Sequence, residues 1–184
     1  IPPNVSLLWT GPGVVSETIN SKTCGDLFHL FHGQVIIWDN YYANDYCPFR
    51  MFMGSFEGRD QETIDQSHGI LLNPTGLYNT DKLLLSLVAE FLKTGETGEA
   101  PWLRVARDYE IHPLVKKYKR FFWSPFASYT EKDILEIKRV EPSEFYEDVI
   151  VKWQNPLRLE WYPYLYGFYL DMQVLCKKEK TESR

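Results

Sequence analysis

The sequence has 184 residues and a formal net charge of −5. This length suffices for one domain, or for one domain with an appended region. With 44% hydrophobic and 24% charged residues, the composition is that of a globular protein and excludes a disordered chain. The acidic balance excludes nucleic acid as an expected partner, since such proteins usually carry a basic stripe.

Three widely spaced cysteines, Cys24, Cys47 and Cys176, form no Cys-x-x-Cys pair, so a zinc knuckle or a redox motif has no support. Free thiols in a reducing compartment are the simplest interpretation. No apolar run approaches the roughly 20 residues of a membrane helix, so we expect no membrane partner. The start, Ile1-Pro2-Pro3, has neither a signal core nor an initiator methionine, and we expect the chain to begin inside a larger protein.

Three short apolar runs, at residues 6–9, 35–38 and 69–72, predict β-strands. Uninterrupted runs of this kind suit parallel strands that are buried on both faces. They recur about every 30 residues, which is the length of one βαβ unit. Because parallel strands point the same way, the polar residues that follow each run should gather at one face of the sheet, where barrel enzymes place their chemistry.

Helical patterns separate and follow these runs. Residues 26–32 predict a short amphipathic helix after the first strand. Asn79 or Thr80 can cap a longer helix after the third strand, and its apolar stripe ends just before Gly95. This helix is expected to pack against the outside of the sheet.

Residues 94–101 have the composition of a linker, which divides the chain into an α/β region, residues 1–95, and a mostly helical region, residues 96–184. The helices expected in the second region cover residues 102–109, a segment capped by Thr130 with Asp133 three positions later, and the aromatic residues 161–176.

The densest polar cluster, residues 38–46, directly follows the second predicted strand. Carboxylates and carboxamides bind hydroxyl groups, and an indole face covers the apolar side of a pyranose ring, so the cluster suits a carbohydrate site. Asp39, Asn40 and Asp45 could instead ligate a metal, but their spacing does not match a calcium loop, and we expect no metal. The remaining alternative is a loop whose side chains cap its own backbone.

A set of sequence blocks lies across residues 5–95. The blocks are Trp9-Thr10-Gly11-Pro12, Val14-Val15-Ser16, Ile37-Trp38-Asp39-Asn40, Ala43-Asn44-Asp45-Tyr46, Arg50-Met51-Phe52-Met53-Gly54, Gly58-Arg59 and Gly69-Ile70-Leu71-Leu72-Asn73-Pro74. In residue type, order and spacing they resemble glycoside hydrolase family 84, and as a set they are highly specific. This family contains β-N-acetylglucosaminidases, among them the protein O-GlcNAcases.

The resemblance implies a set of substrate contacts. Asn40 would hold the N-acetyl region, Asp45 would accept hydrogen bonds from the far hydroxyls of the GlcNAc ring, and Asn73 would bind ring hydroxyls. Trp38 and Val14 would line the pocket near the sugar and its aglycone. A GlcNAc-bearing glycoprotein or glycan is the implied substrate, and no cofactor is implied.

The resemblance also implies a retaining glycosidase in which the substrate's acetamido oxygen attacks the anomeric carbon and forms an oxazoline. Two adjacent aspartates perform the acid–base work of this scheme. No Asp-Asp pair occurs in the sequence, so we expect no catalytic residue in this chain. An upstream half, in the same polypeptide or in a second chain, would supply the pair, and this chain would form the last three βα units of a (β/α)8 TIM barrel.

A non-catalytic relative that binds sugar or acts as a scaffold is the alternative, because every matched residue binds rather than transfers protons. For the C-terminal region, the resemblance implies a helical stalk that forms a homodimer. It also implies a cytoplasmic or nuclear location, in line with the unpaired cysteines.

Overall fold

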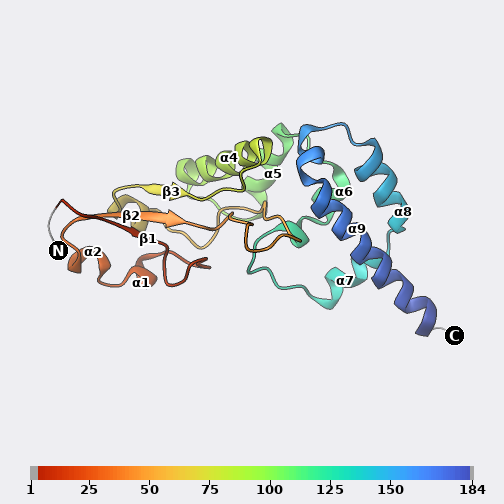
Figure 1. Ribbon diagram of the computed structural model, residues 1–184, viewed down its shortest axis with the longest axis horizontal. Helices are drawn as coiled ribbons and strands as arrows, with labels where there is room; N and C mark the ends of the chain where they lie inside the picture. Colours follow the sequence, from red (N-terminus) through yellow and green to blue (C-terminus); the bar gives the residue numbers. More distant parts are fainter. Residues whose placement is uncertain (1–3, 183–184) are drawn as a thin grey trace.

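The computed structural model describes residues 4–182 of an elongated α/β protein, with the strands at one end and the last helix at the other (Figure 1). Residues 1–3 and 183–184 of the two predicted regions lie outside this range. The N-terminal elements are β1 (Ser6–Trp9), α1 (Ser21–Cys24), α2 (Leu27–Leu30), β2 (Gln34–Asp39), α3 (Gln61–Gln66), β3 (Ile70–Leu72) and α4 (Tyr78–Thr94).

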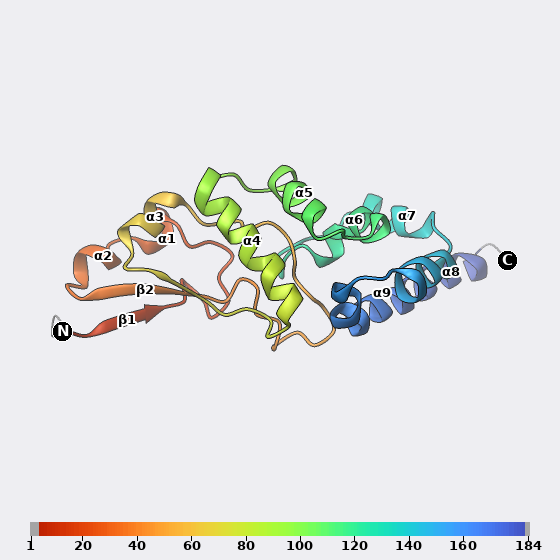
Figure 2. The same ribbon diagram turned by 90° about the horizontal axis from the view of Figure 1, so that it is seen from above.

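The elements after α4 are helical within the described residues, and they gather beyond the end of the sheet (Figure 2). They are α5 (Glu99–Asp108), α6 (Pro113–Lys117), the 3-10 helix η1 (Lys119–Phe122), α7 (Glu131–Lys138), α8 (Pro142–Phe145), the π-helical segment η2 (Tyr146–Lys152) and α9 (Pro156–Glu182). The predicted cap of α7 is present, because Thr130 Oγ1 accepts a hydrogen bond from Asp133 N.

The three strands form one parallel sheet in the order β1-β2-β3. Trp9 at the end of β1 pairs with Ile37, and Leu72 at the end of β3 pairs with Asp39, so the carboxyl ends of the three strands lie at the same end of the sheet. The predicted strands and their parallel direction are thus confirmed. The short helices α1, α2 and α3 return the chain between the strands.

One face of the sheet is buried and the other is open, so this chain by itself covers its apolar strands on one face only. Ile37 of β2 packs with Ile19 and Cys24, whereas its neighbour Trp38 points to the opposite face and is 40% exposed. Leu8 of β1 and Leu71 of β3 are also exposed. The open face therefore carries large apolar side chains that a further layer of structure would bury.

Helix α4 begins before the predicted capping residues. Asn79 and Thr80 lie in its first turn, and their backbone N–H groups donate to Glu160 of α9 at 2.9 and 2.8 Å. A carboxylate brought by tertiary packing has taken the role that we assigned to a local cap. The predicted stop is confirmed, because Gly95 adopts a left-handed conformation (φ 69°) and donates to Phe91 O.

The main hydrophobic cluster joins the loop after β2, helix α4 and the helical region. Met53, Trp102 and Trp161 are fully buried in it, and Trp102 Nε1 donates to Met53 O at 2.6 Å. The predicted linker is shorter than expected, since α5 already begins at Glu99. The hydrophobic core is therefore continuous across residue 95. The division of the chain into two regions at that residue stays a prediction.

Candidate functional site

A cavity of about 580 Å³ opens at the carboxyl ends of the strands. Its volume lies within the range of roughly 300–1,000 Å³ that is typical of small-molecule pockets. All the residues that the sequence predicted as substrate contacts line this cavity. Its lining residues are Thr10, Val14, Val15, Trp38, Asn40, Ala43, Asp45, Tyr46 and Asn73.

Hydrogen bonds link the segments that follow the three strands. Asn73 Nδ2 donates to Asn40 Oδ1 at 3.0 Å, and Asn40 Nδ2 donates to Val14 O at 2.6 Å. Asn40 is only 7% exposed, so this relay fixes the orientation of its amide group. An amide has two N–H donors and two acceptor lone pairs, so each group keeps capacity for a ligand.

Residues 44–47 form a turn that presents Asp45 and Tyr46 at its centre, since Cys47 N donates to Asn44 O at 3.0 Å. The Asp45 side chain is exposed along the cavity, and its Oδ1 accepts a hydrogen bond from Tyr46 N at 3.1 Å. Burial, together with the nearby Cys47 and Asp45, raises the pKa of Tyr46 to about 12. The phenol therefore stays protonated at neutral pH and can donate to a ligand.

Trp38 and Val14 give the cavity its apolar wall. Trp38 stands on the open face of the sheet because it alternates with the buried Ile37 and Asp39. Val14 lies in the loop after β1 and is 77% exposed. An exposed indole beside amide and carboxylate groups is the combination that favours a sugar ring, whose faces are apolar and whose rim carries hydroxyls.

Asp39 belongs to the polar cluster but turns away from the cavity. Its carboxylate is 1% exposed and accepts hydrogen bonds from Arg59 Nε at 2.8 Å and Arg59 Nη2 at 2.7 Å. Asp39 Oδ1 also accepts from Tyr41 N at 2.9 Å, so for this residue the alternative of a self-capping loop applies. The remaining N–H groups of Arg59 bind the carbonyls of Ser16, Glu17 and Glu57.

Sequence reasoning left out some of the lining residues, namely Thr10, Val15, Ala43 and Tyr46. Each of them is a direct neighbour of a predicted contact or stands in one of the matched blocks. Membership of the matched blocks was thus the signal that could have found them. The hydrogen bonds that hold these segments in place join distant residues and leave no such local signal.

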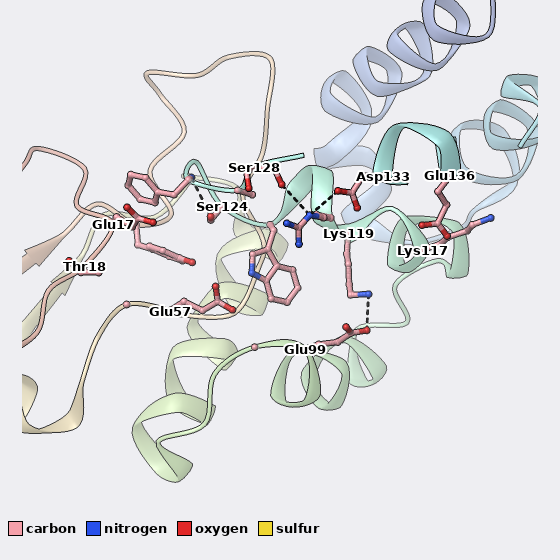
Figure 3. Close-up of a pocket in the computed structure, with 17 residues that line it drawn as sticks. Glu17, Thr18, Glu57, Glu99, Lys117, Lys119, Ser124, Ser128, Asp133 and Glu136 are labelled. Atoms are coloured by element: carbon pink, nitrogen blue, oxygen red, sulfur yellow. Dashed lines mark hydrogen bonds and ion pairs between the residues drawn. The ribbon is translucent and has the colours of Figure 1, made fainter. Parts of the chain in front are cut away.

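A second cavity, of about 690 Å³, lies between the sheet end and the helical region (Figure 3). Charged side chains line it, and several of them pair with one another. Lys119 Nζ lies 2.8 Å from Glu99 Oε1, and Arg120 Nε lies 3.3 Å from Asp133 Oδ2. No predicted substrate contact lines this cavity, and we take the cavity at the strand ends as the candidate site.

Comparison with known protein families matches residues 1–120 to the beta-N-acetylglucosaminidases. The match covers more than half of the sequence. The chain belongs to this family. The resemblance deduced from the sequence blocks is thereby confirmed.

The β-N-acetylglucosaminidase relatives include the protein O-GlcNAcases of Rattus norvegicus and Mus musculus. Each is 33% identical to this chain over 96 residues, which is 52% of the chain and 10% of the relative. The chain therefore spans about a tenth of the length of these curated relatives.

Solved structures share the fold. An O-GlcNAc hydrolase variant of Thermobaculum terrenum superposes with a TM-score of 0.67 at 22% identity, covering 95% of this chain and 44% of that one. The protein named CpGH84B superposes with a TM-score of 0.57 at 16% identity, covering 85% and 28%. Since the first match spans nearly the whole chain, both the sheet and the helical region share that fold.

Within residues 4–182, no helix is long and apolar enough to cross a membrane. In the same part of the chain, no group of three His, Cys, Asp or Glu side chains is placed to hold a metal ion. The thiols of Cys24 and Cys47 are free, and Cys24 is buried.

Proposed function

We propose that this family member supplies the sugar-binding wall of a β-N-acetylglucosaminidase that hydrolyses O-GlcNAc-type glycosides. The observation that carries the proposal is the convergence of Asn40, Asp45 and Asn73 on one cavity at the strand ends. The names of the curated relatives and the family match support the same reaction class.

Each of the predicted substrate contacts has a distinct role in this proposal. Asp45 accepts hydrogen bonds from two hydroxyls on the far side of the GlcNAc ring, and Asn73 binds a ring hydroxyl beside it. Asn40, held between Asn73 and Val14, faces the N-acetyl group. Trp38 covers the apolar side of the sugar and Val14 lines the aglycone end.

The proposed reaction proceeds by substrate assistance. The acetamido oxygen forms a bond to the anomeric carbon, and the bond to the leaving oxygen breaks as one aspartate protonates that oxygen. A second aspartate orients the acetamido N–H and takes its proton, which gives a neutral oxazoline. Water then adds to the anomeric carbon from the opposite face as the bond from that carbon to the oxazoline oxygen breaks, so that the configuration is retained. The first aspartate, now a carboxylate, takes a proton from the water, and the second returns its proton to the nitrogen. By holding the acetamido group, Asn40 would favour the attacking geometry.

We propose that the adjacent aspartates come from an upstream barrel half, in the same polypeptide or in a second chain. The three parallel βα units described above would be the last three of a (β/α)8 barrel. Its missing part would cover the open face, where Leu8, Trp38 and Leu71 are 46%, 40% and 49% exposed. An uncovered apolar sheet face of this kind favours completion by a further layer.

A non-catalytic sugar-binding or scaffolding relative is the second candidate, and one observation favours it. The sequence has no Asp-Asp pair, and the residues of the cavity bind without transferring protons. The two candidates share the cavity and differ in whether an acid pair completes it.

Hydrolysis of a fluorogenic β-GlcNAc glycoside separates these candidates. We expect no turnover by the 184-residue chain alone, and turnover by a longer polypeptide that joins it to a barrel half with adjacent aspartates. Turnover by neither, with GlcNAc still bound by the chain, would favour the non-catalytic relative. Turnover by the chain alone would contradict our placement of the acid pair.

We further propose that the helical region forms a homodimer. Tyr166, Leu170 and Val174 form an exposed stripe at four-residue spacing on α9, with exposed fractions of 37%, 43% and 55%. Analytical ultracentrifugation should detect a dimer that Leu170→Glu dissociates. A monomeric wild-type chain at micromolar concentration would contradict this proposal.

The free thiols of Cys24 and Cys47 support our proposal of a cytoplasmic or nuclear location, because reducing compartments keep thiols from forming disulfides. Imaging of a tagged chain in any other compartment would contradict it.

A further inference from the structure

Helix α9 contacts the loop after β2, which carries Asp45, and the first turn of α4, which follows the loop that carries Asn73. Figures 1 and 2 both show the loop after β2 reaching the first turns of α9. Glu160 and Tyr164 make these contacts, and they lie on one face of α9 because residues four apart are neighbours on a helix. Neither residue lines the cavity.

The first contact holds the turn that presents Asp45. Asn44 precedes Asp45 in the sequence but does not line the cavity and is 7% exposed. Its Nδ2 donates to the hydroxyl of Tyr164 at 2.9 Å. Because Asn44 O also closes the turn by accepting from Cys47 N at 3.0 Å, the position of Asn44 sets the position of Asp45.

The second contact holds the start of α4. The carboxylate of Glu160 accepts hydrogen bonds from the backbone N–H and the side chain of Asn79 at 2.9 and 2.8 Å, and from those of Thr80 at 2.8 and 2.7 Å. Burial raises the pKa of Glu160, but these hydrogen bonds together bring it below its ordinary value. Glu160 is therefore ionised at neutral pH and fixes the first turn of α4.

This anchoring extends to the segment that follows Asn73. Asp81, in the same first turn of α4, accepts hydrogen bonds from Thr75 N at 2.9 Å and Thr75 Oγ1 at 2.6 Å. Its other oxygen accepts from Gly76 N at 3.1 Å. A continuous set of contacts thus leads from Glu160 through α4 to the loop that carries Asn73.

We propose that Glu160 and Tyr164 are positioning residues, through which α9 sets the separation of Asp45 and Asn73 and so completes the sugar site. The inference rests on the proposed function where it concerns sugar binding. The placement of the loop can be measured without any sugar. Fixing both loops before the sugar arrives would spare the sugar the entropic cost of ordering them.

Amide hydrogen exchange in the unliganded 184-residue chain tests the loop placement directly. Tyr164→Phe removes only the hydroxyl and leaves the buried Asn44 amide without its partner. We expect exchange of the Cys47 amide to rise roughly fivefold to tenfold, because one hydrogen bond no longer opposes opening of the turn. Tyr162→Phe on the same helix is the matched control and should leave this exchange unchanged.

Asn44→Ala breaks the same contact from its other end and should produce the same rise, which covers the case in which Tyr164→Phe does not fold. Unchanged exchange at Cys47 in a folded Tyr164→Phe or Asn44→Ala chain would overturn the inference, whatever the chain binds.

A double-mutant cycle in the completed barrel tests the sugar readout. Tyr164→Phe should raise KM for a β-GlcNAc glycoside roughly fivefold, and it should have little further effect when Asp45 is already alanine. The same factor in both backgrounds would show a merely structural role and would overturn the inference. If the wild type neither binds nor cleaves the sugar while Cys47 exchange still rises in Tyr164→Phe, the proposed function fails and the loop-holding role stands.

Discussion

Asp45→Ala should lower kcat/KM for a β-GlcNAc glycoside about 10²–10⁴-fold in the completed barrel. Asp45 stands exposed at the centre of the turn over residues 44–47, where its carboxylate can accept two sugar hydroxyls. A hydrogen bond to a charged group contributes about 1.5–3 kcal/mol, and each 1.4 kcal/mol is a factor of ten. The loss of two such bonds gives the expected range, measured from initial rates across substrate concentration.

Asp65→Ala is the matched control for this prediction. Asp65 is also an exposed aspartate, but it lies on α3 away from the cavity. Its removal should leave kcat/KM within about twofold of the wild type, since isolated surface substitutions have small effects. If Asp45→Ala retained a third or more of the wild-type kcat/KM, the assignment of Asp45 as a sugar contact would be wrong.

The strands and the cavity could be predicted because both leave local signals. The apolar runs at residues 6–9, 35–38 and 69–72 predicted a parallel sheet, and parallel strands bring the residues after them to one edge. Asn40 and Asn73 follow different strands, and the sheet register places their amide groups 3.0 Å apart. The matched blocks then singled out the same positions.

The contacts that hold the cavity residues could not be predicted, because they join positions far apart in the sequence. Arg59 is 20 positions from Asp39, Glu160 is 81 from Asn79, and Tyr164 is 120 from Asn44.

Without these contacts, the sequence offered only local explanations for the same residues. We assigned the start of α4 to a cap by Asn79 or Thr80 and placed Asp39 in the polar cluster of residues 38–46. In both cases a distant charged side chain satisfies the groups that the local pattern left unpaired. The open face of the sheet also leaves no local signal. Continuous apolar strands show only that both faces can be covered, and not which layers this chain itself supplies.

Arg59→Met should lower the free energy of unfolding of the chain by about 3–5 kcal/mol, because it leaves the Asp39 carboxylate buried without its countercharge. Arg59 is itself almost fully enclosed, with its guanidinium carbon 4.5 Å from the ring centre of Tyr41 and 5.2 Å from that of Phe56. Methionine retains much of the packing against these rings but none of the five hydrogen bonds. Urea unfolding of both chains measures the difference.

Two further variants show where the cost of Arg59→Met arises. Arg107→Met replaces an exposed arginine on α5 and should change the stability by less than about 0.5 kcal/mol. The double variant Asp39→Leu with Arg59→Met should be more stable than Arg59→Met alone, because it removes the uncompensated charge as well as its partner.

A loss in the free energy of unfolding below about 1 kcal/mol for Arg59→Met, or a double variant that is less stable still, would mean that the pair does not hold these segments together.

The buried pair also has a consequence for the sugar site. Arg59 binds the carbonyls of Ser16 and Glu17, and the loop that contains them also supplies the Val14 carbonyl to Asn40. The buried Arg59–Asp39 pair thus fixes the Val14 end of the hydrogen-bonded relay that runs through Asn40 to Asn73. Helix α9 fixes the Asn73 end of this relay through α4. Arg59→Met should therefore also weaken sugar binding, although Arg59 itself lies outside the cavity.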